Sequence, residues 1–361
     1  MKVHRKRQLS NIFILVIAYT IIGAVVSVYD YFLLNSELSR GPSKYYRLLE
    51  TLMYNAIAGF SAGLLGGTFL TALNRRIKAK SFSYGQMLGA FYFLVLFFFL
   101  STATAIVTTY NIVGLDLSNP KVLEVFKVHF FSSLHLKNLI LWITVFQLTQ
   151  FWLQLQQKFG PGNLWKMFLG KYHKPRTEPR IFMFLDLKSS TTIAEKLGES
   201  KYHQFLQDVF SDITEPISES KAEIYQYVGD EIIITWHVDK IKEKNRCLNI
   251  FFDIQKEFES KREEYLEKYN TIPKFKAGAH TGTSVVGEIG IIKRDITYSG
   301  DLLNTTARIQ GKCNDFGSMF LISGQLKNYL ADSSEKWDFS SEGFINLRGK
   351  ESKIELYTVS I

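Results

Sequence analysis

Cysteine is scarce in this chain of 361 residues, which contains only Cys247 and Cys313. Both lie in the half that we predict to be cytosolic, where thiols stay reduced, so a structural disulfide is not expected. No cluster of cysteines suggests a zinc site, and there is no internal repeat or low-complexity tract. The scarcity of cysteine therefore argues against a fold held together by disulfides.

Acidic residues are scarce in the first half of the chain. Residues 1–160 hold 15 Lys and Arg but only five Asp and Glu, whereas residues 161–361 hold 28 and 29. The net charge of +9 therefore belongs to the first half. These positive charges flank long apolar runs and do not form a folded polar face, so they indicate membrane flanks and not a nucleic-acid partner.

Four apolar stretches are each long enough, at about 20 residues, to cross the hydrocarbon core of a membrane as a helix. They lie at residues 11–34, 51–74, 86–110 and 138–157. A cleaved signal peptide would explain only the first, and a soluble domain of buried helices is the alternative for all four. We therefore predict a membrane domain over residues 1–157 with four transmembrane helices.

The positive charges also predict the orientation of these spans. Lys and Arg are frequent before the first span, after the second and after the fourth, and segments of this kind stay in the cytoplasm. We expect a multi-pass protein of the cell membrane, in contact with lipid, with both termini and the second domain in the cytoplasm. Asp30, near the outer end of the first span, is interpreted as an interfacial residue.

Residues 116–137 are predicted to form a helix on the outer surface, because apolar side chains are interspersed there with Lys and His. Such a helix could sense an upstream signal, whose identity the sequence does not reveal. His129 and His135 could bind a metal, although two histidines on a surface helix are usually just solvated.

Residues 158–179 are predicted to form a linker at the membrane interface that couples the two domains. Its Gly-Pro-Gly sequence breaks a helix, and its aromatic and basic residues suit the interface. The second domain, residues 180–361, begins with the apolar run 181–187, which is typical of a buried strand. Helices are then predicted near 190–220, 242–268 and 301–312, and strands at 274–280, at 284–289 and around 344–348 and 353–360. This alternation of strands with helices and hairpins predicts an α/β (α+β) domain with a mixed or antiparallel sheet.

Two carboxylates stand at the ends of predicted strands. Asp186 is near the end of the first strand, and Asp230 is at the turn of a predicted hairpin, YQYVGDEIIITW (225–236). Either alone could be structural, at a helix start or in a turn. Together they could hold a divalent cation, because Mg²⁺ is usually bound by one or two carboxylates and substrate phosphates. Glu231 is expected to be a turn residue or a helix-facing partner and not a second ligand.

A third segment, ITYSGDLLNTTARIQ (296–310), places Asn304 and Arg308 four residues apart, hence on one face of a predicted helix. An amide and a guanidinium that project together can stabilise the oxygens that gain negative charge in phosphoryl transfer. An isolated pair of this kind is more often a polar helix surface. Arg348 and Lys350, in a predicted strand turn, could reach a polyphosphate.

Taken together, these segments resemble the catalytic domain of the class III nucleotidyl cyclases, the adenylate and guanylate cyclases, over about residues 178–361. The similar motifs are FLDLKSSTTIAEKLG, YQYVGDEIIITW, KFKAGAHTGTSVVGEIG, ITYSGDLLNTTARIQ and INLRGKESKIELYTV, in the order and spacing of that family. The resemblance implies a ferredoxin-like cyclase fold. It also implies a membrane-anchored adenylate cyclase that converts ATP to 3′,5′-cyclic AMP and pyrophosphate for signalling.

The resemblance assigns the metal site as well. It implies that Asp186 and Asp230, with the backbone of Leu187, bind two Mg²⁺ or Mn²⁺ ions, which activate the ribose 3′-hydroxyl and hold the triphosphate. The family forms each site between two subunits. Because this chain has one copy of every element, the resemblance implies a homodimer with two sites.

The remaining residues are assigned to the substrate by the same resemblance. Asn304 would orient the ribose, and Arg308 would stabilise the transition state. The phosphates would be bound by Arg348, Ser189, Ser190 and Thr191. Ser189 stands where the family commonly has a Gly. The backbone around the phosphates is therefore expected to differ in detail from the family pattern.

Base choice in this family is made mainly at two positions, which fall at Gln226 and Thr297. Adenylate cyclases commonly have Lys and then Asp or Thr there, whereas guanylate cyclases have Glu and Cys. Thr297 fits adenine, whereas the Gln226 amide can pair with either base. Adenylate cyclase is therefore favoured, and guanylate cyclase is the alternative.

Two further alternatives are weaker. A diguanylate cyclase also has a Gly-Asp-Glu turn, but that family has a second Gly where Val228 stands and lacks the helix with Asn and Arg. The chain could instead be a membrane receptor with a catalytically silent, nucleotide-binding cyclase-like dimerisation module. The presence of Asp186, Asp230, Asn304 and Arg308 together argues against a silent module.

Overall fold

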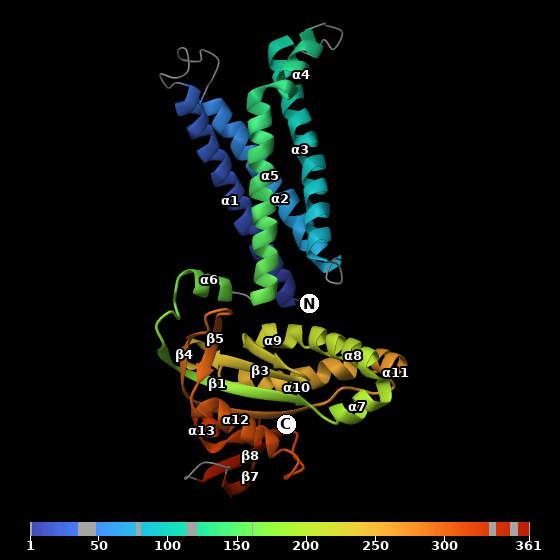
Figure 1. The fold of residues 1–361 in the computed structure, drawn as a ribbon, viewed down its shortest axis with the longest axis vertical. Coiled ribbons are helices and arrows are strands. Elements are labelled where there is room, and N and C mark those ends of the chain that lie inside the picture. The colour runs from blue at the N-terminus through green and yellow to red at the C-terminus, as the bar shows by residue number, and fades with distance from the viewer. Residues whose placement is uncertain are drawn as a thin grey trace. The chain divides into compact units, whose positions relative to one another are not determined.

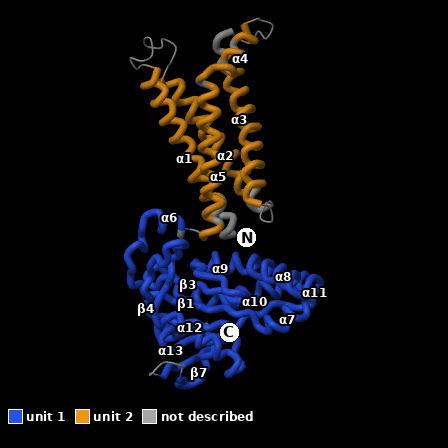
Figure 2. Tube along the Cα trace, viewed as in Figure 1, with its two compact units in different colours: residues 1, 162–361 blue, residues 2–161 orange. Residues whose placement is uncertain are grey.

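The structure, a computed structural model, describes residues 2–34, 48–76, 81–113, 121–160, 162–331, 337–346 and 353–360. The chain divides into two compact units, residues 2–161 and residues 162–361 (Figure 2). The first unit is entirely helical in its described part, and the second is built on a β-sheet. Each unit has its own buried apolar cluster.

The helices of the first unit are long. They are α1 (Lys2–Leu34), α2 (Leu48–Arg76), α3 (Phe82–Val113), α4 (Lys121–Phe131) and α5 (Ser133–Phe159). Three segments are long and apolar enough to cross a membrane, namely Leu9–Leu34, Leu48–Ala72 and Phe82–Val107. Four spans were expected from the sequence, and the fourth, residues 138–157, lies in α5, which is not among these three.

The glutamines of α5 explain this difference. Gln150 donates a hydrogen bond from Nε2 to the carbonyl of Gly85 (2.6 Å), and Gln154 accepts one from Gln86 (3.0 Å). Polar side chains lower the hydropathy of α5, and some of their groups bond to α3, although among the described residues the side-chain oxygens of Gln147 and Gln150 are buried without a partner. The prediction of four apolar spans is therefore supported for three helices.

A buried ion pair also joins the helices of the first unit. Asp30 of α1 is only 2% exposed, and its carboxylate pairs with Lys137 of α5. The sequence predicted no partner for Asp30, because 107 residues separate it from Lys137. The predicted helix over 116–137 is interrupted in its described part, since Ser132 ends α4 and caps α5 by accepting a hydrogen bond from His135.

The sheet of the second unit has eight strands. They are β1 (Arg176–Leu187), β2 (Glu223–Val228), β3 (Glu231–His237), β4 (Phe275–Ile289), β5 (Asp295–Ser299), β6 (Phe320–Ser323), β7 (Asp338–Ile345) and β8 (Ile354–Ser360). The order is β2-β3-β1-β4-β6-β8-β7, with β5 paired to β4. Among the described strands only β4 and β6 are parallel, so the sheet is mixed, which is one of the two arrangements that the sequence predicted.

The first four strands and their helices follow the order βαββαβ, with neighbours β2-β3-β1-β4 all antiparallel. This is the ferredoxin-like arrangement. Two details differ from the sequence prediction. The strands expected at 274–280 and 284–289 form one continuous strand, β4. The reason is that every residue of β1 pairs with β4, from Leu187↔Phe275 to Arg176↔Val286. The first four residues of β1 lie in the segment that was expected to be linker.

The helices of the second unit are short. They are α6 (Asn163–Phe168), α7 (Ser190–Leu197), α8 (Glu199–Asp212), α9 (Thr214–Ser220), α10 (Arg246–Ser260), α11 (Arg262–Tyr269), α12 (Asp301–Gly311) and α13 (Gly324–Tyr329), with a 3₁₀ turn at Val238–Lys240. The helical pattern of 190–220 forms three helices, because Gly198 at φ 74° separates α7 from α8 and a break at Ile213 separates α8 from α9. Helices α8 to α11 lie on one face of the sheet, and α12 lies on the other (Figure 1).

The side chains of β1 alternate between these two faces. Ile181, Met183, Leu185 and Leu187 join the main apolar core together with residues of α7 to α11, and we call this side the core face. Phe182 and Phe184 pack with Leu302 of α12 on the opposite side, which we call the α12 face. Arg180 and Asp186 share the parity of these phenylalanines and therefore lie on the α12 face as well.

Candidate active site

The hairpin of β2 and β3 places Asp230 at its tip. Val228 pairs with Glu231, so the loop consists only of Gly229 and Asp230. Gly229 has a φ of 62°, which a glycine adopts without steric cost and which a two-residue hairpin requires. The predicted hairpin is confirmed. On the next strand, Asp186 is the direct cross-strand partner of Glu231, so the turn lies beside the end of β1.

Asp186 is partly buried next to charges of both signs. Its side chain is 28% exposed, and its Oδ2 lies 3.5 Å from Nζ of Lys276. Burial raises the pKa of Asp186, the negative charge of Asp230 raises it further, and Lys276 and a hydrogen bond from Gln310 lower it in part. Asp230 directly precedes Glu231, the cross-strand partner of Asp186, so the two aspartates occupy neighbouring positions at this edge of the sheet.

Glu231 stands on the same face of the sheet as Asp186. Burial, and then the charges of Asp186 and Asp230, raise the pKa of Glu231 to about 7. Within the described residues, no group of three or more His, Cys, Asp or Glu could hold a metal ion by itself. The donor set therefore fits a divalent ion that takes two carboxylates from the protein and its other oxygens from a phosphate substrate.

Sequence reasoning missed two residues beside Asp186. Lys276 of β4 is the cross-strand partner of Asp186, and its ammonium also donates to Asn314 (3.2 Å). Gln310 of α12 is 8% exposed and hydrogen-bonds to Asp186. Helix α12 comes this close because Gly278 has no side chain: a Cβ there would lie 2.3 Å from the backbone nitrogen of Gln310. The alternation of β4 could have indicated Lys276, since positions 276 and 278 share one face.

The segment after Asp186 leads into the start of α7. Leu187 is buried, so its side chain belongs to the core face and only its backbone can serve the site. Ser189 adopts a left-handed conformation with φ 60°, which is uncommon for residues other than glycine. Ser190 begins the helix and hydrogen-bonds to Tyr202, and Thr191 is exposed. The first amides of a helix are suited to binding phosphate oxygens.

Asn304 and Arg308 lie on α12, as predicted, but not in the same environment as Asp186. Asn304 is exposed and Arg308 is partly exposed. Within the part of the chain that the structure describes, neither side chain makes a hydrogen bond or an ion pair, in contrast to Gln310 on the same helix. The single chain therefore leaves an amide and a guanidinium available on its surface.

Gln226 is on β2 and Thr297 is on β5, two strands that meet on the α12 face through the tyrosines next to these residues; by the alternation of β5, Thr297 itself lies on the face opposite to Tyr298. Gln226 is exposed on β2, next to an irregularity in its pairing with β3. Thr297 is on β5 and makes only a long hydrogen bond of 3.5 Å to Gly287. Their chain neighbours, Tyr225 and Tyr298, meet edge to face with ring centres 5.1 Å apart. Arg348 and Lys350 lie outside the described residues.

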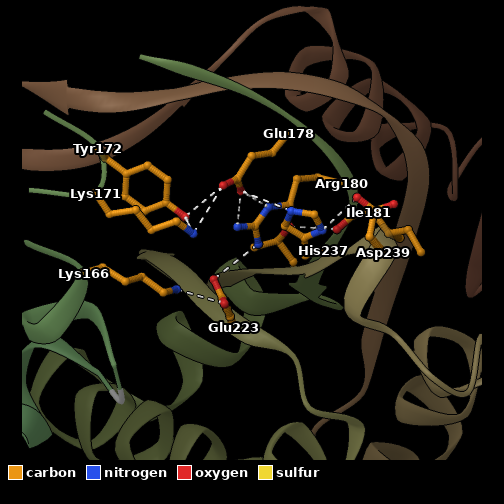
Figure 3. A network of polar contacts seen from close by, with 10 residues as sticks. Lys166, Lys171, Tyr172, Glu178, Arg180, Ile181, Glu223, His237 and Asp239 are labelled. Carbon is orange, nitrogen blue, oxygen red and sulfur yellow. Dashed lines mark hydrogen bonds and ion pairs between the residues drawn. The ribbon is translucent and has the colours of Figure 1, made fainter. Parts of the chain in front are cut away.

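A network of charges connects residues that precede β1 with residues of β1 and β2 (Figure 3). Arg180, 1% exposed, donates to Glu178 (2.6 Å) and to Glu223 (3.3 Å), and its guanidinium lies 5.1 Å from the ring centre of Tyr298. Lys166 of α6 donates to Glu223 (2.9 Å). The contact of Lys166 with Glu223 thereby links the segment before β1 to the start of β2, the strand of Gln226. The contact of Arg180 with Tyr298 links the same network to β5.

Comparison with known proteins identifies related chains. The family described as "Adenylate and Guanylate cyclase catalytic domain" matches residues 173–360. "Adenylate cyclase 2" of Rhizobium meliloti (strain 1021) is 35% identical over 180 residues, which are 50% of this chain and 50% of that protein. "Adenylate cyclase 1" of the same organism is 27% identical over 191 residues, 49% of this chain and 27% of that protein. This chain thus covers no more than half the length of these relatives.

A solved structure of a bacterial light-regulated adenylyl cyclase shares the fold. Its sequence is 20% identical, its TM-score is 0.51, and the similarity covers 60% of this chain and 64% of that one. At this identity, the similarity concerns the fold and not the details of the site.

Proposed function

Because the chain belongs to the adenylate and guanylate cyclase catalytic domain family, we propose that it is a membrane-bound adenylate cyclase that converts ATP to 3′,5′-cyclic AMP and pyrophosphate. The observation that carries this proposal is the neighbouring pair of carboxylates, Asp186 at the end of β1 and Asp230 at the hairpin tip, on a face of the sheet that also holds a lysine. The two carboxylates repel one another in the absence of a cation, and a shared divalent ion would offset that repulsion.

The reaction needs the ribose 3′-oxygen to attack the α-phosphorus and pyrophosphate to leave. Mg²⁺ or Mn²⁺, held by Asp186, Asp230 and the backbone carbonyl of Leu187, would activate the hydroxyl and neutralise charge on the triphosphate. Lys276 would exchange its contact with Asp186 for a phosphate oxygen once the carboxylates hold cations. The segment from Ser189 to Thr191 and Arg348 would bind the remaining phosphate oxygens.

The unpaired residues of α12 support a site shared between two subunits. Asn304 and Arg308 leave their polar groups at the surface, whereas the carboxylates are approached by Gln310 of the same helix. In a homodimer, Asp186 and Asp230 of one subunit would face Asn304 and Arg308 of the partner subunit. Arg308 of the partner subunit would then stabilise the charge that develops on the transferred phosphoryl group.

ATP is the proposed substrate, and GTP is the second candidate. Thr297 supports adenine, because its hydroxyl makes only a long internal hydrogen bond and can accept one from the exocyclic amine. The names of the relatives from Rhizobium meliloti agree with this choice. GTP stays in consideration because Gln226 is exposed and its amide can present either a donor or an acceptor.

The first unit is proposed to anchor the enzyme in the cell membrane. Three apolar helices support this location, and we propose that α5 crosses as the fourth span with its glutamines turned toward α3. The charge pattern favours both termini and the cyclase domain in the cytoplasm. The charge network at Arg180 supports a coupling role for the preceding segment, since it reaches the strands of Gln226 and Thr297.

The test compares ATP and GTP turnover by the detergent-solubilised full chain with Mn²⁺. We expect cyclic AMP and pyrophosphate in equal amounts and a turnover of GTP at least tenfold lower. Faster turnover of GTP would replace the adenylate assignment by the guanylate alternative. No product from either nucleotide would leave the chain as a silent module and contradict the proposal.

A further inference from the structure

A cavity of about 240 Å³ lies in the first unit, lined by residues of α2, α3 and α5. Its wall is mostly apolar and aromatic, with Phe93, Phe97 and Trp142 among the lining side chains. Among the described residues, no Asp, Glu, Lys or Arg lines it. An apolar protein cavity of about 150 Å³ can hold benzene. This cavity therefore has room for an uncharged molecule the size of two fused rings.

The wall also carries polar groups on α3 and α5. Ser101 of α3 and His135 of α5 are within hydrogen-bond distance, with Oγ 3.3 Å from Nδ1. Asn138, one turn further along α5, lines the cavity, and its Oδ1 is buried without a hydrogen-bond partner. A buried carbonyl oxygen left unpaired costs about 1–3 kcal/mol. Because the side-chain amide of Asn rotates over a broad range, Asn138 can turn this oxygen toward a molecule in the cavity.

We propose that this cavity is a ligand site for a small, flat, uncharged aromatic molecule that carries one N–H or O–H donor, which is accepted by the side-chain oxygen of Asn138. The rings of the wall favour an aromatic body, and the unpaired oxygen favours a donor. A lipid acyl chain would fill the space but would leave the oxygen of Asn138 unpaired. The proposal concerns binding alone and does not depend on the cyclase reaction.

The test uses the full chain in nanodiscs of phosphatidylcholine and two fluorinated probes observed by fluorine NMR. One probe is a fluorinated indole, which has one N–H donor. The other is the matching fluorinated benzofuran, which has the same shape and no donor. Empty nanodiscs correct for partition into lipid. We expect saturable binding of the indole, about fivefold tighter than that of the benzofuran, as one hydrogen bond predicts.

Three variants locate the site. Asn138→Leu removes the acceptor oxygen but keeps a side chain of similar size, and it is expected to abolish the preference for the indole. Ala58→Phe fills the cavity from α2 and is expected to remove saturable binding of both probes. Ile57→Phe changes the neighbouring residue, which is 60% exposed, and should bind as the unmodified chain does.

Thermal unfolding of each variant checks that it is folded, and Asn138→Leu decides the question if Ala58→Phe does not fold. Three results would overturn the proposal: uptake no greater than in empty nanodiscs, equal affinity for both probes, or an unchanged preference in Asn138→Leu. A tightly held phospholipid that prevents indole binding would also overturn it.

Discussion

The two faces of the cyclase sheet differ in how completely they are covered. On the core face, side chains of β1, β3 and β4 join a continuous apolar cluster with α7 to α11. On the α12 face, buried apolar residues of the described chain form two small clusters of four residues each, and Asp186, Glu231 and Lys276 stand beside them. The same strands therefore provide an apolar core on one side and a polar, partly exposed surface on the other, because successive side chains of a strand point to opposite faces.

The largest effect is expected from a change on the α12 face that leaves the core face untouched. Asp230→Ala removes one of two cation ligands and should lower kcat by about 10³-fold or more, the scale expected for lost electrostatic stabilisation. Its thermal midpoint should not fall, because the change relieves repulsion with Asp186. Asp253→Ala, at an exposed position of α10, is the matched control and should keep full activity. Activity retained in Asp230→Ala would refute the role of the carboxylate pair.

The converse change is on the core face. Phe205 is fully buried and contacts the rings of Tyr202, Tyr265 and Tyr269. Phe205→Ala should lower the free energy of unfolding by about 3–5 kcal/mol, as is usual for a truncated core aromatic residue. Thermal unfolding should show a midpoint lower by about 10 °C. The folded fraction should keep its kcat, and a selective loss of kcat would show that the two faces are not separable.

The third prediction tests whether a second subunit completes the α12 face. Asp186→Ala and Arg308→Ala should each be inactive alone. Random mixing makes half of the dimers heterodimers, and each of these keeps one intact site of two, so the mixture should recover about one quarter of the activity of the unmodified protein. The measurement is cyclic AMP formation after the two solubilised variants are mixed. Recovery should be absent when Asp186→Ala is mixed with Asp230→Ala, because both changes affect the same half of each site.

The fourth prediction concerns the charge network on the α12 face at Arg180. Burial alone would raise the pKa of Glu223, but Arg180 and Lys166 lower it below its ordinary value of 4.5. Because the pKa of Glu223 is lower in the folded state, its charge stabilises the folded protein at pH values above the ordinary pKa. This stabilisation is lost as the pH falls through the pKa of the folded state. Glu223→Gln should therefore make the thermal midpoint less dependent on pH below about 4.5. Glu267→Gln, at an exposed position of α11, should leave the pH profile unchanged.

The smallest effect is expected at the left-handed residue beside Asp186. Ser189→Gly should raise stability by about 0.5–1 kcal/mol, because glycine adopts a φ of 60° without steric cost. Gln204→Gly, at an exposed position in the middle of α8, is the control with the opposite sign, since glycine lowers stability by about the same amount inside a helix. Thermal midpoints should shift by about 2–4 °C in opposite directions. A lower midpoint for Ser189→Gly would show that the serine side chain makes a stabilising contact.

Local patterns were sufficient for much of the fold. The apolar run 181–187 predicted β1, and the Gly-Asp turn predicted the β2–β3 hairpin, because both depend on neighbours in the chain. The helix at 301–312 was predicted as α12 to within one residue. In contrast, β5 was not predicted, because its five residues pair only with β4 and carry no turn signal of their own.

What the sequence by itself determined is the alternation of β1, the turn that carries Asp230 and the spacing of Asn304 and Arg308, since each follows from a local period of the chain. The tertiary structure decided which residues meet. Lys276 pairs with Asp186 across 90 positions of sequence, and Lys137 pairs with Asp30 across 107, because strand register and helix packing bring them together. Register and packing are properties of the whole fold, and no local window contains them.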